Sequence, residues 1–180
     1  MNHVDNIIFH YLDATEDELH AGMTWYSEAN ELARSLSPDN VWRGAGVIAA
    51  YSPLTPWWRN RELAIDSLTT GIANPKSLPH SVKCAQLILD GLHPLEVFKG
   101  DKTRAFASAI AEPENSTIAT IDRHAYNLAM GTMEGNPTIG KRIFRTLSDA
   151  YIESANLAGI SVAQMQAIAW VVFRRRKGLS

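Results

Sequence analysis

Asp122 is the side chain of this sequence with the clearest chemical use. It follows a short run of apolar and hydroxylated residues, TIATI (117–121), and precedes a helical pattern that begins at Arg123. A carboxylate at such a junction often caps the helix by accepting backbone N–H groups. Partly desolvated beside apolar residues, it can also face a developing positive charge or take a proton from water. The sequence leaves both interpretations open.

Basic residues gather around a predicted turn at residues 99–101. The stretch FKGDKTRAF (98–106) indicates a short helix, a tight turn and a second helix, whose first N–H groups would be free to bind an anion. Lys99, Lys102 and Arg104 lie around this turn, which favours a phosphate site; an ordinary helical hairpin is the alternative. Lys102 could also be a nucleophile, because a lysine desolvated near other cations can form a Schiff base.

Two adjacent tryptophans begin another predicted helix, in YSPLTPWWRNRELA (51–64). Trp57 and Trp58 cannot both point inward, so we expect one in the core and the other near a groove with Arg59 and Asn60. Exposed tryptophan and arginine can stack on an unpaired base or wedge between base pairs. Packing of a half-buried tryptophan against a neighbouring helix explains the same pattern.

Four basic residues, RRRK (174–177), follow an apolar stripe near the end of the chain. Cations at a helix C-terminus relieve the helix dipole, which is a sufficient structural reason for them. Contact of Arg174 and Arg175 with phosphate is the alternative.

The composition limits the classes of site. A single cysteine, Cys84, excludes a disulfide framework and a four-cysteine iron–sulfur site. His20 and Glu16 share a helical face without a third ligand, so we expect no metal and no cofactor. No secretory signal or membrane-length apolar run of about 18 residues is present, and we expect a soluble cytoplasmic protein that contacts no membrane.

Charge is distributed unevenly along the chain. Residues 1–40 carry eight acidic side chains and one basic one, a net charge of −7, and residues 41–180 carry sixteen basic and eleven acidic ones, a net charge of +5. This division suggests a basic part that faces an anionic ligand and an acidic part that faces away. Uneven surface solvation is the alternative.

The hydrophobic pattern predicts an all-α protein. No segment alternates with period two, and Gly and Pro fall between helical patterns. Capping boxes at Thr15–Glu18 and Ser161–Gln164 mark two helix starts. The predicted helices cover residues 15–35, 41–51, 57–71, 81–90, two in 94–110, one from Asp122, 139–157 and 161–175.

Taken in order, these segments resemble the helix-hairpin-helix DNA glycosylase superfamily, the endonuclease-III-like fold. The resemblance covers about residues 41–177 and rests on VIAAYSPLTP, FKGDKT and the D-x-H junction in TIDRHAYNLAMG. It implies a two-lobed helical fold with DNA in the cleft between the lobes. We therefore expect one domain, 1–180, with acidic N-terminal helices in 1–40, a helical lobe with the hairpin and Asp122 in 41–131, and C-terminal helices in 132–180.

The resemblance also implies residue roles. Asp122 would be the catalytic aspartate, Lys102 the Schiff-base lysine of bifunctional members, and Lys99 to Thr103, with Gly100, the phosphate-binding hairpin. His124 would pack or hydrogen-bond beside the aspartate. Ser52 lies in the Ser-Pro turn, and Leu54 takes the position of a glutamine that some members insert into the duplex. Only one hairpin glycine is present, and Asp101 follows it.

Three functions follow from this comparison. The first is a DNA-binding enzyme that acts on a flipped-out base, most simply an N-glycosylase that uses Asp122. The second is DNA base hypermodification. It comes from a resemblance to phage-encoded relatives with a Ser-Pro turn followed by Trp and Asn, some of which displace pyrophosphate from an activated thymine derivative. The residues that would hold the pyrophosphate are Arg59, Lys102 and Arg123. The third is a non-catalytic DNA- or protein-binding module. We expect a monomer, in the host cytoplasm if the chain is phage-encoded.

Overall fold

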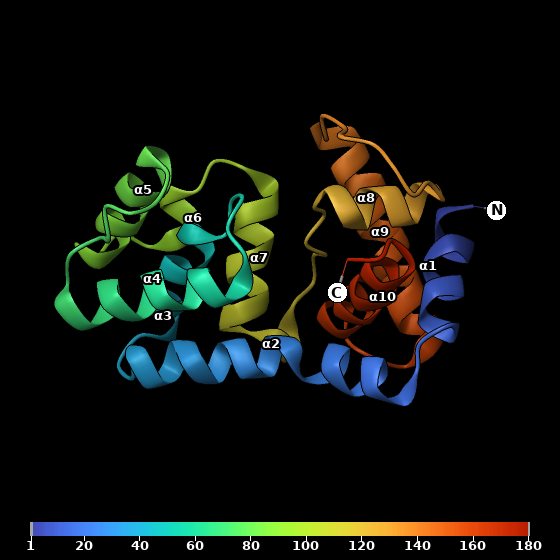
Figure 1. The fold of residues 1–180 in the computed structure, drawn as a ribbon, viewed down its shortest axis with the longest axis horizontal. Helices are drawn as coiled ribbons and strands as arrows, with labels where there is room; N and C mark the ends of the chain where they lie inside the picture. The colour runs from blue at the N-terminus through green and yellow to red at the C-terminus, as the bar shows by residue number, and fades with distance from the viewer. Residues whose placement is uncertain (1, 180) are drawn as a thin grey trace. The chain divides into compact units, whose positions relative to one another are not determined.

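The computed structural model describes residues 2–179, and every regular element within them is a helix (Figure 1). The predicted all-α class is confirmed. The elements are α1 (His3–Leu12), α2 (Glu16–Leu36), α3 (Val41–Tyr51), α4 (Trp57–Thr70), α5 (Pro79–Leu89), α6 (Pro94–Val97), α7 (Asp101–Ala111), a 3₁₀ turn η1 (Pro113–Asn115), α8 (Arg123–Met130), α9 (Lys141–Ala158) and α10 (Val162–Arg176).

The helices form two compact units. Unit 1 holds the chain up to Tyr26 and from Pro113 onward, and unit 2 holds Ser27–Glu112. These boundaries differ from the expected ones at 40/41 and 131/132. The physical reason is that α1 packs against α8, α9 and α10, so that the first helix shares a core with the last three. Asp122 therefore belongs to unit 1 and the hairpin to unit 2.

The predicted capping boxes begin two helices. At α2, Glu18 N–H donates to Thr15 Oγ1 (3.3 Å) and Thr15 N–H donates to Glu18 Oε2 (2.9 Å). At α10, Ser161 and Gln164 make the same reciprocal pair. Each box satisfies N–H groups that a helix start leaves without partners. The start of α1 is a third box, made by Asn2 and Asp5, which the sequence analysis did not assign.

In unit 2, α3 lies against α4, α5 and α7. Two glycines allow its close approach to neighbours. A Cβ at Gly44 would lie 2.4 Å from the Ala33 carbonyl oxygen, and a Cβ at Gly46 would lie 2.4 Å from Pro94 Cγ. The apolar run at 41–51 is therefore a buried helix whose small residues fit between neighbouring elements.

In unit 1, α10 is the most buried element of the core. Met165, Ile168 and Phe173 are fully enclosed there, and a Cβ at Gly22 of α2 would lie 2.5 Å from the Ile168 Cα. This packing fixes the direction in which the exposed face of α10 presents Trp170 and Arg174.

No single helix within residues 2–179 combines the length and apolar character of a membrane span. The pair α9 and α10 passes by length and composition only when taken together, across a bend of 98°.

Candidate functional site

Asp122 uses both of its carboxylate oxygens. It is the N-cap of α8, where Oδ1 accepts the Ala125 N–H at 2.7 Å, and Oδ2 accepts the indole N–H of Trp170 at 3.2 Å. The side chain is half-buried. Because an ionised carboxylate offers about four lone-pair sites, the two hydrogen bonds fix its orientation and leave acceptor capacity for a further group.

The segment before Asp122 is held by two other helices. Ala119 N–H donates to Ser148 Oγ of α9 at 3.1 Å. The Tyr26 hydroxyl of α2 donates to Gln166 Oε1 at 2.7 Å and lies 3.2 Å from the Thr120 hydroxyl. All these groups belong to unit 1. This buried polar network therefore fixes the backbone of residues 119 and 120, which lead into Asp122.

A second buried tyrosine supports the first turn of α8. The Tyr151 hydroxyl donates to the carbonyl of Ala125, the residue whose N–H is capped by Asp122 Oδ1. Burial, and then the negative charge of Asp122, raises the pKa of Tyr151 well above its ordinary value. Tyr151 therefore remains a protonated donor at neutral pH, which suits a supporting role.

Trp170 and Arg174 form a stacked pair one helical turn apart on α10. The Arg174 guanidinium lies 4.6 Å from the centroid of the Trp170 ring, and its Nε donates to the Leu179 carbonyl at 3.3 Å. The contact with phosphate expected of Arg174 remains a prediction, since the side chain keeps partial exposure.

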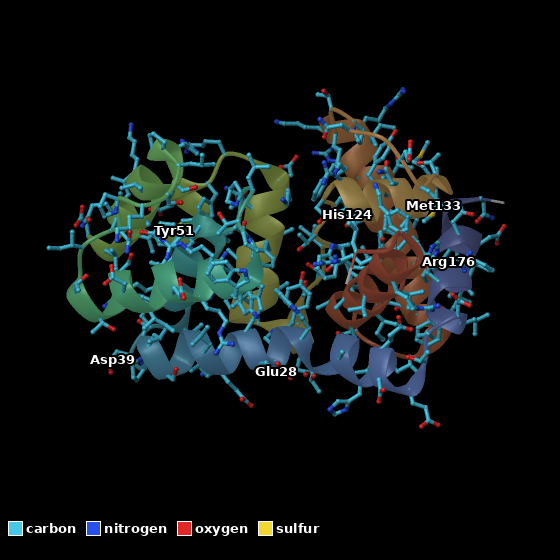
Figure 2. All side chains as sticks on the ribbon, viewed as in Figure 1. Glu28, Asp39, Tyr51, His124, Met133 and Arg176 are labelled. Carbon is cyan, nitrogen blue, oxygen red and sulfur yellow. The ribbon has the colours of Figure 1, made fainter. Side chains whose placement is uncertain are left out.

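His124, which Figure 2 labels, lies near two aromatic side chains. Its ring centroid is 6.3 Å from that of Trp170 and 6.0 Å from that of Phe173. Its Nδ1 is buried and has no hydrogen-bond partner among residues 2–179. Burial lowers the pKa of His124; the charge of Asp122 opposes this effect and that of Arg123 adds to it. The ring is therefore mainly neutral at pH 7.

The basic end of α10 pairs with acidic residues. Arg175 contacts Glu18 at 2.7 Å and Asp13 at 3.0 Å. Arg176, which Figure 2 labels, lies over the ring of Phe9 and contacts Asp13 at 3.0 Å. Acidic residues near the start of the chain therefore contact its basic tail, and the expected division into a basic part that faces an anionic ligand and an acidic part that faces away stays a prediction. The carboxylates engage Nε and Nη2 of Arg175, and its expected contact with phosphate stays a prediction.

The predicted hairpin is present in unit 2, between α6 and α7. Gly100 is the N-cap of α7, and no side chain of the described chain caps this helix. Its φ of −87° is ordinary, and no described atom lies within 4 Å of where a Cβ would stand. The fold of the hairpin does not require glycine at position 100, and the absence of a side chain at this position leaves open space beside the start of α7.

The hairpin cations have different surroundings. Lys99 Nζ donates to the Glu96 carbonyl at 2.8 Å, and Arg104 donates to the carbonyls of Leu95 and Phe98. Arg104 therefore holds the turn together instead of extending from it, which corrects its expected place in the phosphate cluster. Lys102 is exposed, so the desolvation that would activate it as a nucleophile is absent; Thr103 is half-buried in the same turn of α7.

The Ser-Pro turn between α3 and α4 presents two apolar side chains. Leu54 has a φ of 56°, in the left-handed region, and its side chain is 95% exposed. Trp58 is 64% exposed and Trp57 is half-buried, so neither lies in the core, where one of the two was expected. Ser52 does not extend outward, because its hydroxyl donates to the Ala49 carbonyl at 2.9 Å.

Asn60 corrects the sequence-based assignment most clearly. It is 2% exposed, and its amide donates to the Ile48 carbonyl at 3.0 Å, near the end of α3, where helix carbonyls lack partners. Asn60 therefore joins α3 to α4 and cannot contact DNA. Its neighbour Arg59 is on the surface and pairs with Glu62 at 2.8 Å.

The comparison with protein families gives one result. A model described as a family of unknown function, DUF7178, matches residues 1–177. The chain belongs to the DUF7178 family. Neither curated proteins nor solved structures gave a match.

In this DUF7178 protein, unit 1 brings together Asp122, Arg123, His124 and Arg174, and unit 2 holds the hairpin and the Ser-Pro turn. Sequence reasoning missed Trp170, because it lies within a stretch interpreted as a core stripe. The signal that could have found it is an indole one turn before Arg174. No cluster of three or more His, Cys, Asp or Glu side chains within residues 2–179 could hold a metal ion.

Proposed function

We propose that this DUF7178 protein is a DNA-binding enzyme of the helix-hairpin-helix glycosylase type, which acts on a base flipped out of the duplex. The observation that carries the proposal is the Asp122 carboxylate, which two N–H donors hold in one orientation at the start of α8. The order of the hairpin, the D-x-H junction and the following helices adds support.

The chemistry assigned to Asp122 is electrostatic. Departure of a base leaves oxocarbenium character on the sugar, and a fixed carboxylate stabilises such charge without reorganising during the reaction. The same group orients the water that attacks the sugar carbon. A donor on each oxygen keeps the carboxylate in place while its remaining lone pairs face the substrate.

The proposal assigns the grip on DNA to unit 2. The uncapped N-terminus of α7 with Gly100 and the exposed Lys102 would bind phosphate, since helix N–H groups favour anions. The exposed Leu54 and Trp58 would contact the bases, by wedging and stacking. Lys102 is assigned to phosphate instead of to a Schiff base, because its side chain is exposed, whereas a nucleophilic lysine is activated by desolvation.

A panel of labelled duplexes tests the proposal. It contains uracil, 5-hydroxymethyluracil, oxidised and alkylated bases and an abasic site, with Asp122→Asn assayed in parallel. Release of a base by the wild type but not by Asp122→Asn, with duplex affinity retained, supports a glycosylase and names its substrate. Equal release by both proteins removes Asp122 from the mechanism.

Base hypermodification is a second candidate, favoured by one observation. Arg123 follows Asp122 directly and is exposed, and a cation beside the reacting carboxylate suits a negatively charged leaving group such as pyrophosphate. Salt-dependent binding without base release, together with pyrophosphate release from an activated thymine in DNA, would favour it. Binding with no product on any substrate would instead indicate a non-catalytic module.

A further inference from the structure

The indole N–H of Trp170 donates to a carboxylate oxygen. Buried or half-buried indoles generally hydrogen-bond through this group, and any carbonyl or water would satisfy it. Here the acceptor is Asp122 Oδ2, 3.2 Å away on an element 48 residues earlier in the sequence. The indole of Trp170 is therefore hydrogen-bonded to the carboxylate that would act in the proposed reaction.

We infer that Trp170 is a positioning residue for Asp122. Its N–H fixes the second carboxylate oxygen, so that the free lone pairs point in one direction. The consequence for turnover rests on the proposed function, whereas the hold on the carboxylate does not. Trp170 acts through Asp122 and is not assigned a contact with the substrate.

One donor alone would leave the carboxylate mobile. The χ2 torsion of aspartate has a broad range of low-energy values. With the Ala125 N–H as the only donor, either carboxylate oxygen could accept it and the other oxygen would have no fixed position. A second donor on Oδ2 removes that freedom. Small losses of orientation at a reacting group cost large factors in rate, which is why a remote indole can matter.

Arg174 and His124 hold the indole in place. The guanidinium of Arg174 covers one face of the Trp170 ring at 4.6 Å, an attractive cation–π contact, and the His124 ring approaches edge-on at 6.3 Å. The plane of the indole, and with it the direction of the N–H, is thereby fixed on α10.

The sharpest variant is Trp170→Phe, which removes the N–H donor and retains an aromatic ring for Arg174 and His124. The chain offers a matched control in Trp42→Phe. Trp42 Nε1 also donates to a carboxylate oxygen at 3.2 Å, that of Glu112, but in unit 2. Any general cost of losing an indole–carboxylate hydrogen bond appears in both variants.

The first measurement needs no activity. In ¹⁵N-labelled protein, the indole cross-peak of Trp170 is assigned by its loss in Trp170→Phe and then compared between wild type and Asp122→Asn. Asparagine has one acceptor oxygen, which the Ala125 N–H occupies, and its NH₂ would face the indole donor. We expect the Trp170 peak to move and its hydrogen exchange to accelerate. An unmoved peak overturns the inference.

The second measurement is kinetic, on the substrate that the duplex panel identifies. Trp170→Phe should lower kcat by about 10- to 100-fold, the range for losing a hydrogen bond to a charged group, with KM and duplex affinity unchanged. Trp42→Phe should retain wild-type kcat, and the cooperative melting of both variants verifies that they fold.

The outcomes separate the two claims. Wild-type kcat in Trp170→Phe, with Asp122→Asn inactive, overturns the positioning role and leaves the proposed function standing. A wild type that acts on no DNA overturns the proposed function, and the indole peak then decides by itself whether Trp170 holds the carboxylate.

Discussion

Arg175 and Asp13 are 162 residues apart in sequence, yet Nη2 of one and Oδ2 of the other form an ion pair at 3.0 Å. Arg175 also contacts Glu18, and Arg176 shares Asp13. The four side chains form a network that joins the end of α10 to the junction of α1 and α2. Two acidic side chains near the start of the sequence thus pair with two arginines near its end, all within unit 1.

Arg175→Ala should lower the urea midpoint of unfolding, because it removes two ion pairs of a connected network. The loss should shrink as salt is raised from 0.1 to 1 M, a range over which the screening length falls from about 10 to about 3 Å. Arg59→Ala, which removes one local surface pair with Glu62, is the control and should change the midpoint less. A salt-independent loss at Arg175 would indicate lost packing instead.

Acid should destabilise the fold through two histidines. Burial lowers the pKa of both His10 and His124 below the ordinary value of 6.5. The unfolded chain therefore binds protons that the folded chain does not, so this stability is fully present above about pH 7 and is lost as pH falls below 6.5. Urea unfolding between pH 7.5 and pH 5 measures it. His124→Phe should flatten the dependence, and an unchanged slope would contradict the assignment.

Gly100→Ala should separate stability from binding. The φ of −87° suits alanine and no described atom is near its Cβ, so unfolding free energy should stay the same or rise by up to about 1 kcal/mol. Duplex affinity should fall, because the methyl group fills the space that the proposal assigns to phosphate. Gly44→Ala is the converse control: its Cβ meets the Ala33 carbonyl, and stability should fall by about 1–3 kcal/mol.

Leu54→Asn should leave the melting temperature unchanged or raise it. Leucine in the left-handed region is strained by about 1 kcal/mol, whereas asparagine adopts that region readily. If Leu54 wedges into DNA, the variant should also flip a target base less, measured by the fluorescence of 2-aminopurine placed beside the target. Equal fluorescence with both proteins would exclude the wedge.

Local patterns were predictable from the sequence, and long-range pairings were not. The boxes at Thr15–Glu18 and Ser161–Gln164 were predicted because each involves residues three apart and follows from helix geometry alone. The helix cap at Asp122 was one of the two interpretations of this residue, because a cap also involves residues three apart. The second partner of its carboxylate, Trp170, lies 48 residues away and no spacing rule indicates it.

The errors have a common physical origin. Asn60 was expected near a groove beside the outward-facing tryptophan, but its amide satisfies a helix-end carbonyl of Ile48 in the core. Arg104 was assigned to a phosphate cluster by charge, but the carbonyls of its own hairpin engage its guanidinium. In both cases the unpaired backbone groups of nearby helix ends determined the role, and sequence does not reveal which side chain will reach them.

The discontinuity of unit 1 has a consequence for synthesis. Residues 27–112 leave the ribosome as an uninterrupted segment and can form their own core before α8, α9 and α10 exist. The helix α1, made before those three elements, keeps Ile7 and His10 in water until they form, although both side chains are buried in the folded protein. Until translation has passed Arg176, unit 1, which carries Asp122, remains unassembled.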